Sequence, residues 1–134
     1  MKVSWGQVKF EKTLLEQVTL YHSQIQHCEF KQTKIVANFD DAVFEDCHFD
    51  QVKFTAGRLG LEYGGRRVRF EHCHFQQCLF RGVELRAVKF INCHFENTEW
   101  HRCLLQGVRF EGGTPPKSMQ FVQTEFSGMA QLKE

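Results

Sequence analysis

The sequence predicts an all-β fold in which short strands coil into a narrow tube, and three regularities predict it. The first is a strict period of five between Val68 and Phe110, where every fifth residue is large and apolar. The second is a small residue two positions before each large one. The third is the return of similar large residues about twenty positions later. A strand repeats every two residues and a helix about every 3.6, so neither alone produces a period of five.

The period covers nearly the whole chain. It reaches back to Trp5 and forward to Phe126, and it is irregular at 36–38, 60–69 and 111–118. We expect one residue to be missing in the first irregularity and one extra residue in each of the other two. All 14 Phe and both Trp occupy the large position, and all 6 Cys occupy the small one. The sequence therefore predicts a single domain, 1–134, with repeats over about 3–128 and a short tail at 129–134.

The five-residue unit, of which Cys73-His74-Phe75 is an example, resembles the repeat of the pentapeptide repeat proteins. The resemblance covers roughly residues 3–128. The common Ala-(Asp/Asn)-Leu core is rare in this chain, and Val or Cys followed by Phe replaces it, which is similar to the quinolone-resistance branch of the family. The resemblance implies a right-handed quadrilateral β-helix of about six coils, in which each side is one pentapeptide and each coil has four sides.

Stacking of the large residues supports this fold on physical grounds. If one coil takes four units, residues about twenty apart lie one above the other at the strand spacing of about 4.8 Å. Burying such side chains stabilises the protein by about 1.5–3 kcal/mol each. The expected core column on the first side consists of Phe10, Phe30, Phe49, Phe70, Phe90 and Phe110. The outward positions beside it would be Lys9, Glu29, His48, Arg69, Lys89 and Arg109, which we expect to form a solvated, salt-bridged wall.

Composition limits the function classes. The formal net charge of +1 does not resemble the strongly acidic surface of a DNA mimic. No apolar run is long enough to span a membrane, and the repeat begins directly after the N-terminus, so we expect a cytoplasmic protein. The six cysteines all fall on inward positions, which favours buried free thiols over disulfides.

Three Cys-His pairs resemble metal-ligand pairs: Cys47-His48, Cys73-His74 and Cys93-His94. Successive residues of a strand point to opposite faces, so Cys points inward and His outward, and one metal ion cannot bind both. We expect His74 and His94 to stack on neighbouring coils. No nucleophile–base arrangement or phosphate-binding loop is present in the sequence, so we expect no metal, no cofactor and no enzymatic activity.

The candidate partner-binding residues are charged or aromatic and fall near the corner between the third and fourth sides. The acidic members are Asp40, Asp41, Glu45 and Asp46, and the others, on the coils just after, are Arg58, Tyr63, Arg66, Arg67, Arg81 and Arg86. Arg and aromatic residues are typical interface anchors. Ordinary surface charge explains the same pattern, and the neighbouring acids would repel the phosphates of a nucleic acid.

We therefore predict a non-enzymatic protein–protein interaction module that presents a rigid charged surface to a protein partner. Two alternatives remain open. The resemblance implies a DNA gyrase or type II topoisomerase-binding protein, and a toxin-neutralising immunity or chaperone protein fits the same features. The open coil ends are unpaired edges, so either end offers a homodimer surface, the C-terminal end first.

Overall fold

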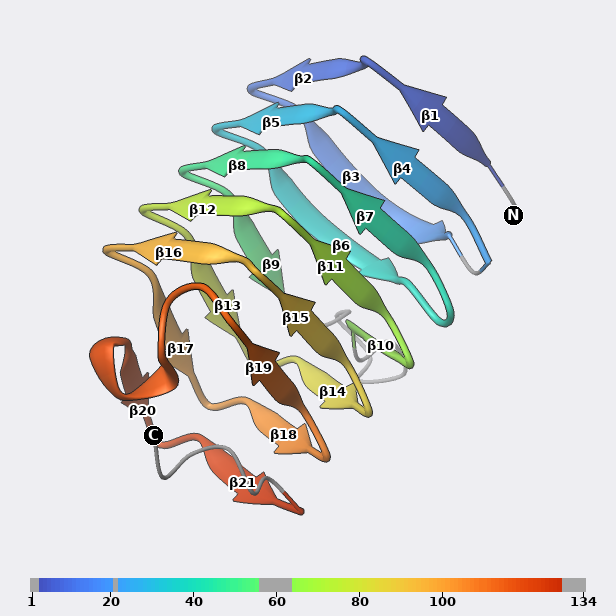
Figure 1. The fold of residues 1–134 in the computed structure, drawn as a ribbon. Coiled ribbons are helices and arrows are strands. Elements are labelled where there is room, and N and C mark those ends of the chain that lie inside the picture. The colour runs from blue at the N-terminus through green and yellow to red at the C-terminus, as the bar shows by residue number, and fades with distance from the viewer. Residues whose placement is uncertain (1–2, 21, 56–63, 129–134) are drawn as a thin grey trace.

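The structure, a computed structural model, describes residues 3–20, 22–55 and 64–128. Short parallel strands stack coil upon coil into a solenoid, and the first and last coils lie at opposite ends (Figure 1). Residues on neighbouring coils pair in register, as Phe10 pairs with Phe30 and Phe70 with Phe90. The largest column of strands has six levels, so the chain rises through about five turns. The predicted all-β solenoid is confirmed.

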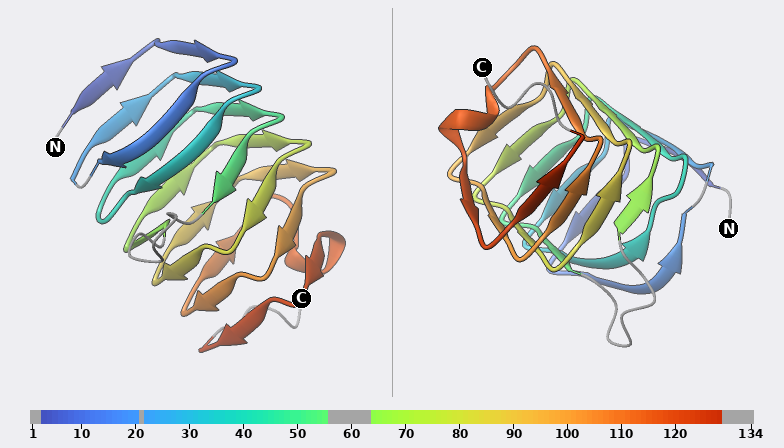
Figure 2. Two further views of the ribbon diagram at one scale, coloured as in Figure 1. Left: turned by 180° about the vertical axis from the view of Figure 1, so that it is seen from behind. Right: turned by 90° about the horizontal axis from the view of Figure 1, so that it is seen from below.

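Each coil has four sides that surround one interior (Figure 2). The first side consists of β2 (Lys9–Glu11), β5 (Glu29–Lys31), β8 (His48–Asp50), β12 (His74–Gln76) and β16 (His94–Glu96). The second consists of the first parts of β3 (Leu14–Thr19) and β6 (Lys34–Asn38), then β9 (Lys53–Thr55), β13 (Leu79–Arg81), β17 (Glu99–His101) and β20 (Gln120–Val122).

The third side consists of the last parts of β3 and β6, then β10 (Gly64–Arg66), β14 (Glu84–Arg86), β18 (Leu104–Gln106) and β21 (Glu125–Ser127). The fourth consists of β1 (Ser4–Gly6), β4 (Gln24–Gln26), β7 (Val43–Glu45), β11 (Arg69–Glu71), β15 (Lys89–Ile91) and β19 (Arg109–Glu111). The 3-10 helix η1 (Pro116–Ser118) replaces a strand on the first side of the last coil.

The five-residue period arises from one side plus one corner. In β12 the side chains of His74 and Gln76 point to solvent, while Phe75 is buried. The next residue, Gln77, turns the chain with φ +53°, and its N–H donates to the carbonyl of Glu96 on the next coil at 2.8 Å. Among the described residues, sixteen that are not glycine adopt a positive φ, almost all of them at such corners. A positive φ at the third position is what a type II turn requires.

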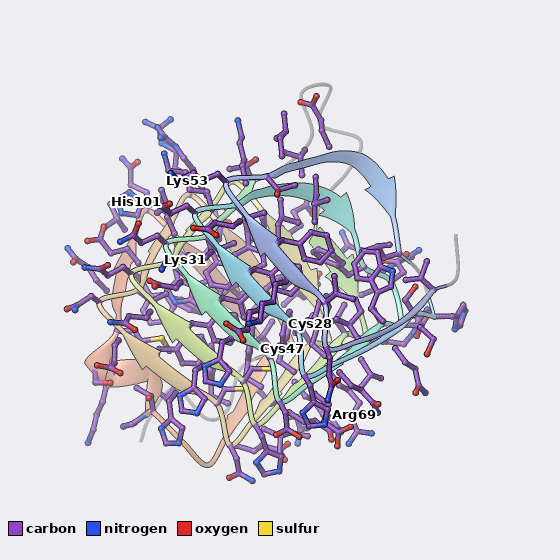
Figure 3. All side chains as sticks on the ribbon, turned by 90° about the horizontal axis from the view of Figure 1, so that it is seen from above. Cys28, Lys31, Cys47, Lys53, Arg69 and His101 are labelled. Carbon is purple, nitrogen blue, oxygen red and sulfur yellow. The ribbon has the colours of Figure 1, made fainter. Side chains whose placement is uncertain are left out.

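The interior is filled by ring stacks and small side chains. Phe75 stacks on Phe49 and on Phe95 with ring centroids 4.7 Å apart in both cases. The small inward residues satisfy backbone carbonyls of the coil below, as when the thiol of Cys78 lies 3.3 Å from the carbonyl oxygen of Phe49. Figure 3 shows Cys28 and Cys47 in this interior, one coil apart. All six cysteines are buried and free, as predicted.

The irregularity at 36–38 is a side shortened by one residue, as predicted. β3 and β6 pair in register up to Glu16 and Val36, and the register then shifts so that Val18 faces Ala37. Gln17 therefore has no counterpart in the shorter strand. The irregularity at 111–118 also matches the prediction, because Phe110 and Phe121 are separated by two sides and one extra residue. Its first-side position is taken by η1, where Pro116 is buried.

The predicted phenylalanine column is wrong beyond Phe49. Phe49 pairs with Phe75, whereas Phe70 pairs with Phe44 on the fourth side. The reason is that Gly65 lies on the side next to that of Phe54 although it follows eleven positions later, so six residues are inserted between these two sides where we expected one. Phe70, Phe90 and Phe110 are buried core residues, but they form their column on the fourth side.

Gly65 occupies the position of a large apolar residue on the third side, between Phe39 on the preceding coil and Leu85 on the following coil. A small cavity of about 20 Å³ lies in the interior next to this level. Its lining is mainly apolar and includes Phe54, Val68 and Phe80. Apolar cavities of this kind stay dry, so the space is a packing defect and too small for a ligand.

Candidate interaction surface

Ion pairs link the coils at the corner between the third and fourth sides. The carboxylate of Asp40 accepts a hydrogen bond from the backbone N–H of Arg66 at 2.9 Å. It also accepts bonds from Arg66 Nε at 3.3 Å and Nη2 at 3.0 Å. Asp40 lies just after β6 on one coil, and Arg66 is the last residue of β10 on the next. The six inserted residues explain why the two are 26 positions apart in sequence.

A second pair lies beside the first. Arg67 Nε and Nη2 donate to the two carboxylate oxygens of Asp41 at 2.7 and 2.8 Å, a bidentate geometry that fixes both side chains. His22 Nε2 lies 3.8 Å from Oδ2 of the same carboxylate. The hydrogen bond from Arg67 holds the pKa of Asp41 below its usual value, and the pKa of Arg67 is raised in turn. We call Asp40, Asp41, Arg66 and Arg67 the paired corner.

The other predicted site residues are distributed over three corners. Arg86 lies directly after Arg66 in the same column, and its Nη2 is 3.7 Å from Glu84. Glu45 and Asp46 lie one side further on, where Gln26 Nε2 donates to Glu45 at 3.0 Å. Arg81 ends β13, one side earlier in the coil. Arg58 and Tyr63 lie outside the described residues.

The acidic and basic residues thus do not form two separate clusters. Asp40 and Asp41 meet Arg66 and Arg67 directly, which neutralises the charges at this corner. The sequence placed these groups near one another but did not reveal the pairing. The missing information was the length of the insertion, because a one-residue insertion would have shifted Arg66 and Arg67 by a whole side.

The wall beside the first-side phenylalanines also differs from the prediction. After His48 come His74 and His94, so this column ends in three stacked imidazoles. The ring centroids are 4.8 Å apart for His48 and His74, and 5.1 Å apart for His74 and His94. Burial, and then the two neighbouring rings, lower the pKa of His74. The expected stacking of His74 on His94 is confirmed. Arg69, Lys89 and Arg109 lie instead on the fourth side, above Val43.

A corner ladder of glutamines was not foreseen. Gln32 Nε2 donates to Gln51 Oε1 at 3.2 Å, and Gln51 Nε2 donates to Gln77 Oε1 at 3.1 Å. All three lie at the corner between the first and second sides with φ of 50–55°. Their spacing in the corrected register would have identified the ladder. Such amide stacks hold side chains in fixed positions on the surface.

The described part of the chain offers little support for a metal-binding site or a nucleophilic cysteine. No group of three or more His, Cys, Asp or Glu residues there is arranged to hold a metal ion. Burial raises the pKa of Cys78 to about 12 and that of Cys103 to about 11, so both thiols stay protonated at neutral pH. A protonated, enclosed thiol is a poor nucleophile. None of the described residues forms a helix long and apolar enough to cross a bilayer.

Comparison with known families agrees with the architecture. Residues 66–99 match the family model described as pentapeptide repeats, in eight copies. The structure shows the same unit of a short side and a corner on the coils before and after this segment. Residues 66–99 therefore consist of pentapeptide repeats. Along the chain the inward pair is most often Val or Cys with Phe.

Solved structures of similar shape were also found. The plasmid-mediated fluoroquinolone resistance protein QnrB1, trypsin-treated and carrying M102R, is 12% identical over 91% of each chain, with a TM-score of 0.31. The pentapeptide repeat protein Rfr23 from the cyanobacterium Cyanothece 51142 is 9% identical over 96% of this chain and 89% of its own, with a TM-score of 0.27. Superpositions this poor add nothing to the assignment. None of the curated proteins compared with the sequence matches it.

Proposed function

We propose that this protein is a non-enzymatic, cytoplasmic interaction module that presents its outer wall to a protein partner. The observation that carries the proposal is the filled interior. Aromatic stacks and small side chains occupy the tube, and the cavity beside Gly65 measures only about 20 Å³. Enzyme sites are usually far larger apolar pockets. Recognition is therefore assigned to the outer side chains.

The wall is suited to recognition because its side chains are held in fixed positions. The bidentate pair of Arg67 and Asp41 and the glutamine ladder are two examples. Parallel strands, with a further hydrogen bond between coils at most corners, hold the backbone beneath them. A pre-organised surface loses little conformational entropy when it binds. We place the centre of the contact at the corner between the third and fourth sides, with Arg86 at that corner and Arg81 at the corner one side earlier.

An affinity capture experiment tests the proposal. The tagged protein is used to isolate a partner, and binding of the purified partner is then measured by biolayer interferometry. Arg81→Glu with Arg86→Glu should weaken binding at least tenfold, because neither arginine has a close, bidentate carboxylate partner. Lys34→Glu with Lys53→Glu, on the second side, changes the net charge equally and serves as the control. Arg66 and Arg67 are left intact because a carboxylate there would face Asp40 or Asp41.

Two results would count against the proposal. One is that no protein binds the tagged chain saturably. The other is that the Arg81/Arg86 variant binds as tightly as the unmodified chain, which would remove these residues from the contact. A light-scattering mass measurement on a sizing column checks for a homodimer through a coil end, where Phe121 and Phe126 are only half-buried.

Binding to a type II topoisomerase is the family-based alternative. The charge pattern does not favour it, since Asp40 and Asp41 are neutralised by Arg66 and Arg67 and leave no free acidic face at that corner. A gyrase supercoiling assay, with and without a quinolone, decides the point. If the protein at micromolar concentration neither inhibits supercoiling nor protects the gyrase from the quinolone, this partner is excluded. Neutralisation of a toxin is the remaining alternative, tested by co-expression with the candidate toxin.

A further inference from the structure

A row of three basic residues and a single arginine flank the corner between the third and fourth sides on the C-terminal coils. Arg69, Lys89 and Arg109 lie in register on β11, β15 and β19 of the fourth side. Across the corner, Arg86 lies on β14 of the third side. Only three positions separate Arg86 from Lys89 in sequence. We call Arg69, Arg86, Lys89 and Arg109 the basic edge. In Figure 3, Arg69 lies on the outside of the tube, away from Lys53.

The row of Arg69, Lys89 and Arg109 is unfavourable for the isolated protein. Like charges on paired strands repel one another, and here three of them are successive. Among the described strands, no other outward column holds three successive residues with a formal charge of the same sign at neutral pH. Stability alone therefore does not account for this row.

A close carboxylate compensates the charge of Arg69, the first residue of the row, but not the charges of Lys89 and Arg109. Arg69 Nη2 lies 2.7 Å from Glu71 Oε2. The residue that corresponds to Glu71 one coil further on is Ile91, so Lys89 has no acid at that place. Within the part of the chain that the structure describes, no carboxylate lies within 4 Å of the charged groups of Lys89 or Arg109. These two cations therefore remain available to an anion from outside.

The corner between this row and Arg86 carries only small side chains. Most other described corners carry a polar or charged residue, with Gly82 and Gly112 as exceptions, whereas this corner carries three small residues in succession, Ala87, Gly107 and Gly128. Their φ values of 55–65° are the same as at the other corners, so the turn itself does not require so small a residue. A Cβ built on Gly107 would make only ordinary contacts, the nearest 3.8 Å from the backbone nitrogen of Ala87. A peptide backbone can therefore approach the corner closely, with the basic row on one side and Arg86 on the other.

We propose that the basic edge binds a short, extended acidic segment of a protein partner, whose carboxylates pair with Lys89 and Arg109 on one side of the corner and with Arg86 on the other. The proposal rests on the interaction function above and names the chemistry of the partner. From Arg69 to Arg109 the row spans two strand spacings, or about 10 Å, which corresponds to about three extended residues. The matching motif therefore carries two or three Asp or Glu residues.

A peptide fits this edge better than a nucleic acid does. Glu71 and Glu111 lie on the outer side of the fourth-side row, and Glu84 lies on the outer side of Arg86. A narrow acidic peptide avoids these carboxylates, whereas the many phosphates of a nucleic acid would meet them. The net charge of +1 also provides no general attraction for a polyanion.

Fluorescence anisotropy with the purified full chain tests the proposal. The probes are a labelled octapeptide of alternating Glu and Ser, the same peptide with Gln in place of Glu, and a single-stranded octanucleotide. We expect only the acidic peptide to bind measurably, with an affinity that falls as salt is raised. Lys89→Glu with Arg109→Glu should weaken it at least tenfold. Lys34→Glu with Lys53→Glu replaces another stacked basic pair and should change it less than about twofold. Circular dichroism and thermal midpoints verify that both variants fold.

Three outcomes would overturn the proposal: no binding of the acidic peptide at millimolar concentration, an equal loss in both double variants, or tighter binding of the octanucleotide. The interaction function fails separately. If a captured partner binds the Lys89/Arg109 variant unchanged, the interaction function stands and the basic edge is excluded. If no partner is found but the peptide binds in the expected pattern, the edge stands and the captured-partner proposal fails.

Discussion

Replacing Phe75 by Ala tests the stacked core at its most enclosed point. Phe75 is 1% exposed and stacks on rings both below and above it, Phe49 and Phe95, at 4.7 Å. Truncating a buried Phe to Ala costs about 3–5 kcal/mol. Each favourable ring pair contributes about 0.5–1.5 kcal/mol beyond its buried area. Because two stacks are lost, we expect a loss near the upper end, about 4–5 kcal/mol.

The matched control is Phe121→Ala in the last coil. Phe121 is half-buried, stacks on Trp100 at 5.7 Å and meets the ring of Phe126 edge-on at 5.0 Å. We expect its replacement to cost about 1–2 kcal/mol, since less area is uncovered and one stack is lost. Urea unfolding followed by circular dichroism and tryptophan fluorescence measures both values, provided that the m-value is unchanged. A loss below about 2 kcal/mol for Phe75→Ala, or equal losses at the two sites, would refute the reasoning.

Three further predictions concern single sites. Asp41→Asn should make the thermal stability of the protein less sensitive to acid. The folded-state pKa of Asp41 is below the unfolded value, so the stabilisation from the ionised carboxylate is present above about pH 4 and is lost as the pH falls further. Thermal midpoints of both proteins should therefore differ at pH 6 and converge towards pH 2, and a constant gap would contradict this. Gly65→Ala should cost about 1–3 kcal/mol, because φ is +155° and the new Cβ would lie 2.8 Å from Val68 Cγ2, whereas Gly6→Ala meets nothing within 4 Å and should cost little. Cys78 and Cys103, with pKa values of about 12 and 11, should resist iodoacetamide at pH 8 in the native protein and react with it in guanidinium. Peptide mapping measures the labelling of each thiol. Rapid labelling of the native protein would contradict the prediction and show that the tube opens.

The side-and-corner unit could be predicted from the sequence because it is local. Whether a side chain points inward depends only on its position within the five-residue repeat. The burial of Cys28 and Phe30 could therefore be predicted from the period alone. The shortened side at 36–38 was also predictable, since Ile35 and Phe39 are both large and are four positions apart.

The register after Phe54 could not be predicted from spacing. Phe54 and Phe70 are sixteen positions apart, which equals three sides and one extra residue or two sides and six extra residues. The two interpretations differ by a whole side, and the deciding position is Gly65, which has no side chain to reveal it. The wrong choice moved Phe70 and Arg69 from the fourth side to the first, and it hid the histidine column.

The sequence by itself determined the repeating unit, the inward and outward faces and the burial of the cysteines, because these depend on neighbours within five residues. The tertiary structure alone decided which charges meet. Asp40 reaches Arg66 across 26 positions, and Lys89 lies above Arg69, because strand pairing between coils sets the register on either side of the insertion. Long-range pairing of this kind depends on how the coils stack, which local periodicity does not encode.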